Sequence, residues 1–222
     1  MWKTLLKDRS YRFNLVVSIF IFLIAAATLK LSGLRAESID APALPDLIHS
    51  SIPLVDVTFI STFGFIVVQI LFWGYFISKK PEELPYAIKV YSMFVLFRSL
   101  FITITSFGAP AVRIDDVPFL NGLFGSLYFT KDLFPSGHTG TPFIAYLLIK
   151  KQPWKNIMLG LTLLMGASVL LLKVHYSIDV LGALFVAYGA KAFYDWLREN
   201  LNPYLQSWFS IIPLPLALKK VL

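Results

Sequence analysis

The chain has 222 residues, of which 57% are hydrophobic and 16% aromatic, and it contains no cysteine. Such a composition favours a membrane protein over a soluble globular one, and the lack of cysteine excludes disulfides, thiolate metal sites and a cysteine nucleophile. The formal net charge is +7, yet only 15% of the residues are charged and no arginine-rich run occurs, so we expect no nucleic-acid partner.

Apolar runs predict six membrane-spanning helices, at about residues 14–29, 57–77, 90–107, 139–149, 157–174 and 178–196. We therefore predict an all-α, polytopic membrane protein in which residues 1–222 form a single transmembrane domain. The fourth run is short by itself and needs residues of the flanking segments to cross a bilayer.

The first predicted helix follows four basic residues, Lys3, Lys7, Arg9 and Arg12. A cleaved signal peptide shows the same pattern, but its apolar core is typically about 7–15 residues long. Because the run in this chain is longer, we favour a helix that stays in the protein.

Proline marks two segments that we do not expect to cross the membrane. In residues 30–56 the proline density argues against a continuous helix, and we interpret His49 there as a surface or interfacial residue. Residues 200–222 are apolar but broken by three prolines, so we expect this C-terminal tail to lie on the membrane surface.

Charged residues stand out in two further places. Arg98 lies in the middle of the third predicted span, where a charge usually faces a cavity or a partner. The longest loop, residues 108–138, contains Arg113, Lys131 and Asp132, and long loops are often functional.

The basic residues predict the orientation of the chain. With six spans and the N-terminus inside, fourteen of the twenty lie inside, namely Lys3, Lys7, Arg9, Arg12, Lys79, Lys80, Lys89, Lys150, Lys151, Lys155, Lys191, Arg198, Lys219 and Lys220. The positive-inside rule therefore predicts cytosolic N- and C-termini. The opposite ends of the helices then face the extracytoplasmic side of a bacterial inner membrane or the lumenal side of a eukaryotic ER or Golgi membrane.

Two of the three histidines lie on that non-cytosolic side, in residues 134–139 (FPSGHT) and 175–179 (HYSID). His175 and Asp179 are four residues apart at the start of a helix, which places them on one face. The carboxylate can then hold one imidazole nitrogen protonated and leave the other with its lone pair outward. This pattern predicts that His175 is a nucleophile toward phosphorus.

The first motif supplies complementary groups. Gly137 permits close approach of the backbone, and Ser136 can donate to an anion together with the amides at the start of the helix. His138 fits a general acid that protonates the leaving oxygen and then a base that deprotonates the incoming alcohol or water.

We expect cationic side chains to offset the phosphate charge, namely Arg98 with Lys131 or Arg113. We expect no metal and no other cofactor, because only two well-placed histidines and one carboxylate are visible and they have a coherent use without one.

The paired motifs resemble those of the type-2 phosphatidic acid phosphatase superfamily, and the chain is most similar to its sphingomyelin synthase branch. Further features of that branch are residues 44–46 (LPD), Arg98 with the Thr/Gly/Pro-containing segment after it, and Asp132 six residues before His138. The resemblance covers roughly residues 44–196.

This resemblance implies roles for four residues. His175 is the nucleophile, Asp179 orients it, His138 is the acid–base group, and Asp132 is a partner of His138. It also implies an active site that faces away from the cytosol.

The chain departs from the phosphatases of the superfamily, which usually carry a Lys-x6-Arg-Pro motif and a Ser-Arg pair ahead of the nucleophilic histidine. Here Arg98 is followed by Ser99, and Ser168 by Val169. A phosphomonoester approaches two negative charges near neutral pH and needs several cations, whereas a phosphodiester carries one. The missing cations favour a phosphodiester.

The sequence thus predicts a lipid phosphotransferase that moves a phospho-headgroup from a phospholipid to a lipid alcohol, such as ceramide or diacylglycerol, through a phosphohistidine. One alternative is a lipid phosphatase, in which water replaces the alcohol and the substrate is phosphatidic acid, a related lipid phosphate or a polyprenyl diphosphate. Another is a non-enzymatic transporter or assembly factor whose histidines relay protons.

Overall fold

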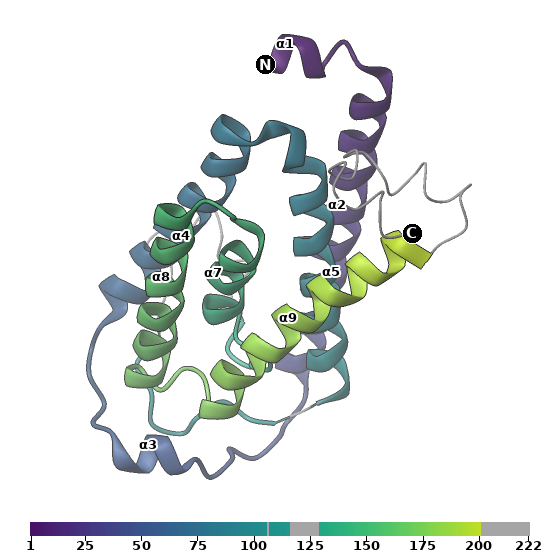
Figure 1. The fold of residues 1–222 in the computed structure, drawn as a ribbon. Coiled ribbons are helices and arrows are strands. Elements are labelled where there is room, and N and C mark those ends of the chain that lie inside the picture. The colour runs from purple at the N-terminus through teal and green to yellow at the C-terminus, as the bar shows by residue number, and fades with distance from the viewer. Residues whose placement is uncertain (106, 116–128, 201–222) are drawn as a thin grey trace.

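The computed structural model of the protein describes residues 1–105, 107–115 and 129–200, and these form helices and no strand (Figure 1). In chain order the elements are α1 (Trp2–Leu5), α2 (Arg9–Ser38), α3 (Leu47–Ser51), α4 (Thr58–Lys79), the 3₁₀ turn η1 (Pro81–Glu83), α5 (Leu84–Ile104), α7 (Gly137–Leu148), α8 (Gln152–Leu171) and α9 (Ser177–Asn200). The predicted all-α class is confirmed for the described residues.

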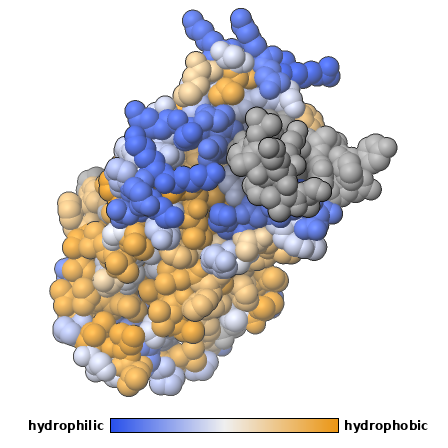
Figure 2. All heavy atoms as spheres, in the orientation of Figure 1, coloured by the Kyte–Doolittle hydropathy of each residue, from blue (hydrophilic) through white to orange (hydrophobic). Residues whose placement is uncertain are grey.

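Among the described residues, five helices are long and apolar enough to cross a membrane: α2, α4, α5 together with η1, α8 and α9. Their outward surfaces carry exposed apolar side chains such as Phe20, Phe59 and Phe185. Figure 2 shows this surface as a broad apolar region below a hydrophilic end. An apolar surface of this extent is typical of a protein embedded in lipid, so the membrane class is supported.

The remaining predicted span is α7, which has only 12 residues. At about 1.5 Å per residue it cannot cross a hydrocarbon layer of about 30 Å alone. It packs on α4, α5, α8 and α9, and its Thr141, Ile144 and Ala145 are buried. The neighbouring helices therefore shield it, which is the condition under which a short helix and its loop are tolerated at membrane depth.

The first helix is longer than predicted, because α2 continues to Ser38. Residues 30–38 are thus helical and not part of the polar connection. We predicted that proline prevents a continuous helix here, and this prediction is wrong for residues 30–38. The first proline of the segment is Pro42, which lies beyond the end of the helix. Lys30 consequently projects from a helix.

The third helix also begins earlier than predicted, at Leu84. This moves Lys89 from the cytosolic boundary into the bundle, where it is 3% exposed and its Nζ donates to Oδ1 of Asn14 at 2.8 Å. Lys89 therefore joins α5 to α2, and as a buried residue it adds little charge to the surface of this end of the bundle.

The other predicted spans agree with α4, α8 and α9 to within one or two helical turns. The predicted interfacial tail, residues 200–222, lies outside the described residues from position 201 onward.

Small residues allow the central helices to approach closely. A Cβ on Gly140 of α7 would collide with the ring of Phe94 on α5, and Ala183 and Ala187 of α9 are fully buried. Small residues at contacts are how membrane helices pack without a hydrophobic driving force between them. As a result α7 and α9, which begin at the two histidine motifs, pack against each other.

The two ends of the bundle differ. At one end, Nε1 of Trp2 donates to the carbonyl of Ile77 at 2.9 Å, and the hydroxyl of Tyr11 donates to the carbonyl of Pro81 at 2.6 Å. The N-terminus therefore lies beside the end of α4. At the other end lie α3 and the starts of α7 and α9 (Figure 1), so the histidine motifs are at the end opposite the N-terminus.

Candidate active site

The structure brings the two motif histidines together, as predicted. His138 is the second residue of α7. His175 follows the end of α8, where Lys173 adopts a left-handed conformation (φ 56°) that turns the chain toward α9. The imidazole centroids of His138 and His175 are 6.1 Å apart, and the ring planes are inclined by 62°.

Asp179 lies behind His175. Its Oδ2 is 3.4 Å from Nδ1 of His175 and accepts a bond of 2.8 Å from the backbone amide of Tyr176. Asp179 is 0% exposed, and His175 is 6% exposed. The contact between Oδ2 and Nδ1 does not have hydrogen-bond geometry. A buried carboxylate that faces Nδ1 nevertheless favours the tautomer with its proton there, and that tautomer has its lone pair on Nε2, at the other side of the ring.

Ser136 connects the two motifs. Its amide donates to the carbonyl of Asp179 at 3.0 Å, and its hydroxyl accepts from the amide of Thr139 at 3.4 Å, which caps α7. The side chain is 0% exposed and does not line the cavity in front of the histidines. The structure therefore gives Ser136 a capping position, whereas we predicted that it donates to an anion.

Arg98 fixes the segment that precedes α7. It lies on the last third of α5 and is 8% exposed. Its Nε donates to the carbonyl of Pro135 at 2.8 Å, while Nη2 donates to the carbonyl of Asp132 at 2.7 Å and pairs with the Asp132 carboxylate at 2.9 Å. The ion pair that the structure gives Asp132 is thus with Arg98, where the resemblance implies His138.

Gly137 lies against this guanidinium. A Cβ at this position would be 3.5 Å from Cζ of Arg98, which is ordinary contact. Gly137 and Arg98 both line the cavity.

The two other predicted cations occupy different positions. Lys131 donates from Nζ to the carbonyls of Glu37 (3.2 Å) and Ile39 (2.8 Å); it fastens the loop to the end of α2 and does not line the cavity. Arg113 does line it, but its Nε is paired at 2.5 Å with Asp115.

A clamp built from the α3 region holds the second motif. Oδ2 of Asp46 accepts from the amide and the hydroxyl of Ser177 at 2.7 and 2.9 Å. Nε2 of His49 lies 2.9 Å from the carbonyl of His175, and its ring stacks on Tyr176 at 5.7 Å. His49 therefore supports the turn at His175 from outside, and no local signal in the sequence indicates these partners.

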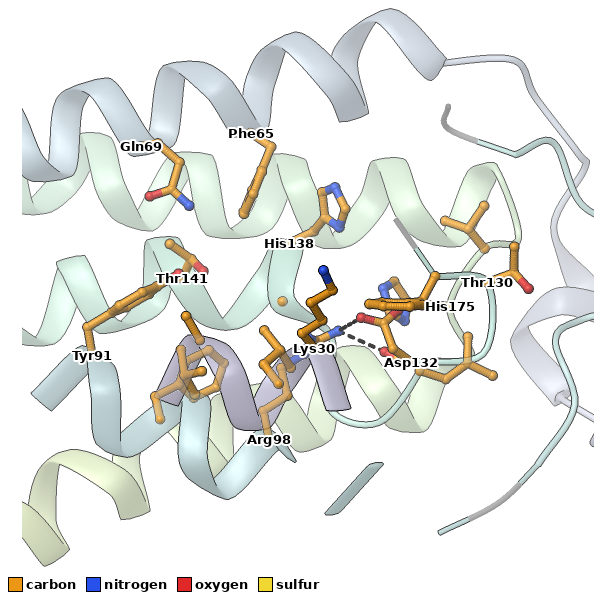
Figure 3. Close-up of a pocket in the computed structure, with 18 of the residues that line it drawn as sticks. Lys30, Phe65, Gln69, Tyr91, Arg98, Thr130, Asp132, His138, Thr141 and His175 are labelled. Atoms are coloured by element: carbon orange, nitrogen blue, oxygen red, sulfur yellow. Dashed lines mark hydrogen bonds and ion pairs between the residues drawn. The ribbon is translucent and has the colours of Figure 1, made fainter. Parts of the chain in front are cut away.

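A cavity of about 330 Å³ lies in front of the histidines (Figure 3). Apolar side chains line part of its wall, including Phe65, whose ring is 4.6 Å from that of His138. Polar groups line the rest, and one of them, Lys30 of α2, was not among the predicted site residues. The sequence would have indicated Lys30 if the first apolar helix had been extended past position 30, as α2 is in the structure.

Among the residues that the structure describes, no group of three or more histidine, aspartate or glutamate side chains is arranged to hold a metal ion. The arrangement brings two imidazoles and several cationic side chains to one cavity, with a buried carboxylate behind one of the rings. A scan of the chain against protein-family models finds no match, and a search of the curated proteins finds none. The resemblance to the phosphatase superfamily thus depends on the motif residues alone.

Proposed function

We propose that the protein is an integral-membrane lipid phosphotransferase that moves a phospho-headgroup from a phospholipid to a lipid alcohol through a phosphohistidine, as the sphingomyelin synthase resemblance implies. The observation that carries the proposal is the imidazole pair at 6.1 Å, with Asp179 behind His175 and a cavity in front. Reacting atoms meet at about 3–3.5 Å, so one phosphoryl group between the rings is within reach of both.

In the first half-reaction, Nε2 of His175 attacks the phosphorus. The N–P bond forms while the bond from phosphorus to the diacylglycerol oxygen breaks. His138 gives its proton to this oxygen, so the leaving group departs as a neutral alcohol. Asp179 faces Nδ1 and stabilises the positive charge that develops on the ring.

In the second half-reaction, His138 is neutral and takes the proton of the acceptor hydroxyl. The acceptor oxygen bonds to phosphorus as the N–P bond breaks, and His175 regains its lone pair. Both histidines return to their starting states, so no net proton is consumed.

The charge around the site supports a phosphodiester substrate. In the superfamily's phosphatases an arginine follows the serine equivalent to Ser168, whereas Val169 stands here and is 0% exposed. A substrate with one negative charge needs fewer cations than one with nearly two.

We further propose a topology of six membrane crossings. Five are the long helices, and the additional one, fourth along the chain, consists of α7 and the segment before it. Lys79 and Lys80 lie at the end of α4, and Lys150 and Lys151 follow α7. The ring of Tyr75 on α4 lies 5.8 Å from that of Trp154 on α8. These lysines therefore gather at the end that holds the N-terminus, which favours a cytosolic position for this end. The histidines are then extracytoplasmic or lumenal.

The test is incubation of the purified protein with labelled phospholipids, with and without ceramide or diacylglycerol. Label on a second lipid is the expected product, and His175→Ala should abolish it. Label released into water from phosphatidic acid alone would instead identify a lipid phosphatase, in which water takes the acceptor's place.

Trapping the intermediate tests the mechanism separately. Wild type given a headgroup-labelled donor without acceptor should retain acid-labile label on the protein, and His175→Ala should retain none. Equal retention by the two proteins would exclude His175 as the nucleophile.

A further inference from the structure

The charges that line the cavity are nearly balanced. Within the described part of the chain, Arg98 is paired with Asp132 at 2.9 Å, and Arg113 with Asp115 at 2.5 Å. Besides the two histidines, the described cavity wall holds one more basic residue, Lys30, which is its one lysine or arginine outside these pairs. Among the described residues no carboxylate lies within ion-pairing distance of it.

Lys30 reaches the cavity because α2 is long. It lies slightly more than two turns before the end of the helix at Ser38 and is an exposed residue. Its side chain extends into the cavity beside His138 and His175 (Figure 3). An ammonium group in this position is free to bind an anion that lies between the two rings.

We propose that Lys30 binds the phosphate of the substrate, and that this one lysine or arginine outside an ion pair in the described cavity wall makes the site selective for a monoanionic phosphodiester over a phosphomonoester. The inference rests on the proposed function and specifies its substrate class. Arg98 and Arg113 contribute less net charge, because each shares its charge with a carboxylate. The proton on His138 passes to the leaving oxygen in the first half-reaction, so Lys30 is the permanent cation that matches the one negative charge of a phosphodiester, whereas a phosphomonoester carries about 1.5 to 2 near neutral pH.

Lys30 thereby takes the place of cations that the superfamily's phosphatases supply from other helices. A lysine binds phosphate as a point charge on a flexible stem, so it can follow the phosphoryl group between donor, His175 and acceptor. Its role is electrostatic, and an arginine at the same position should perform it in part.

The first test replaces Lys30. Lys30→Met should lower kcat/KM for a phosphodiester lipid by roughly 10- to 100-fold, the worth of a hydrogen bond to a charged group, and Lys30→Arg should recover most of it. Lys7→Met is the matched control, because it removes the same charge from an exposed position at the opposite end of the molecule and should retain wild-type activity.

The second test removes the ion-pair partner of Arg113. Asp115→Asn leaves Arg113 without its carboxylate, so the cavity gains one unpaired positive charge. The ratio of phosphatidic acid turnover to phosphodiester turnover should rise by about tenfold. An unchanged ratio would contradict the charge-matching argument.

Binding separates this inference from the proposed function. Glycerophosphocholine, a soluble phosphodiester, should raise the melting temperature of wild type and of Lys7→Met but not of Lys30→Met, and glycerol 3-phosphate should have a smaller effect. If wild type shows this pattern but turns over no lipid, Lys30 is a phosphodiester site and the proposed reaction is wrong. If wild type is active and Lys30→Met equals it in binding and turnover, the Lys30 inference is wrong and the reaction stands.

Discussion

At the scale of residues, the guanidinium group of Arg98 holds the loop that precedes α7. It bonds two carbonyls and one carboxylate of residues 132–135, and this segment leads directly into His138. The sequence indicated that a charge within a span faces a partner, because solvation is lost there. It could not indicate which partner, since Asp132 and Pro135 meet Arg98 only through the fold of the loop. We therefore interpret Arg98 as a positioning residue at the edge of the cavity.

Arg98→Lys should reduce transfer activity by at least about tenfold and destabilise the protein by about 2–3 kcal/mol, because an ammonium cannot replace the fork and leaves buried acceptors unpaired. Headgroup transfer and the melting temperature in detergent are the measurements. Arg35→Lys makes the same exchange at an exposed position and should change neither. Full activity of Arg98→Lys would show that charge alone is sufficient.

At the scale of elements, short segments far apart in sequence position the motifs. The clamp of Asp46 and His49 holds residues 175–177, and Phe134 packs against Gly182 of α9. Hydropathy predicted the long helices well, because lipid exposure imposes apolar runs of fixed length. It placed the end of the first helix too early and gave no sign of the clamp, since single polar contacts leave no periodic pattern.

Asp46→Asn should weaken the clamp. Burial raises the pKa of Asp46, but bonds from the amides of His49 and Ser177 and from the Ser177 hydroxyl outweigh it and lower the pKa. A lowered folded-state pKa means that the stabilisation is complete above the unfolded value of about 3.9 and is lost as pH falls through the folded-state pKa. We expect a loss of about 1 kcal/mol at pH 7.

Unfolding in detergent at several pH values measures this effect, and the difference between wild type and Asp46→Asn should shrink below about pH 4. Asp40→Asn removes a carboxylate from an exposed site in the same connection and is the control. A difference that is constant down to about pH 2 would rule out the carboxylate's bonds as its source.

Gly182→Ala should disturb the first motif, because an added Cβ would collide with the ring of Phe134. Displacing a packed aromatic ring costs about 1–3 kcal/mol, and His138 should shift with it. Gly189 lies on the same helix, and a Cβ added there would meet nothing within 4 Å, so Gly189→Ala should be neutral or stabilise the helix by up to about 1 kcal/mol. Melting temperatures and transfer rates of the two variants provide the comparison.

On the scale of the whole molecule, the two ends of the bundle differ in their residues. Lys79, Lys80, Lys150 and Lys151 lie at the end that holds the N-terminus, while α3 and the starts of α7 and α9, which carry the histidine motifs, lie at the other end (Figure 1). The sequence indicated this polarity through the positions of its basic residues. It could not indicate how α7, with 12 residues, is accommodated among the longer helices, because that depends on the helices that surround it.

The absence of cysteine allows the topology to be tested with single introduced cysteines and a membrane-impermeant maleimide. In sealed vesicles of known orientation, Ser78→Cys at the end of α4 should be labelled only from the cytosolic side, and Ser50→Cys in α3 only from the opposite side. Thr4→Cys and Asn200→Cys test the number of crossings. Six crossings place both on the cytosolic side, whereas five place them on opposite sides, and the wild-type chain gives the background because it has no thiol to react.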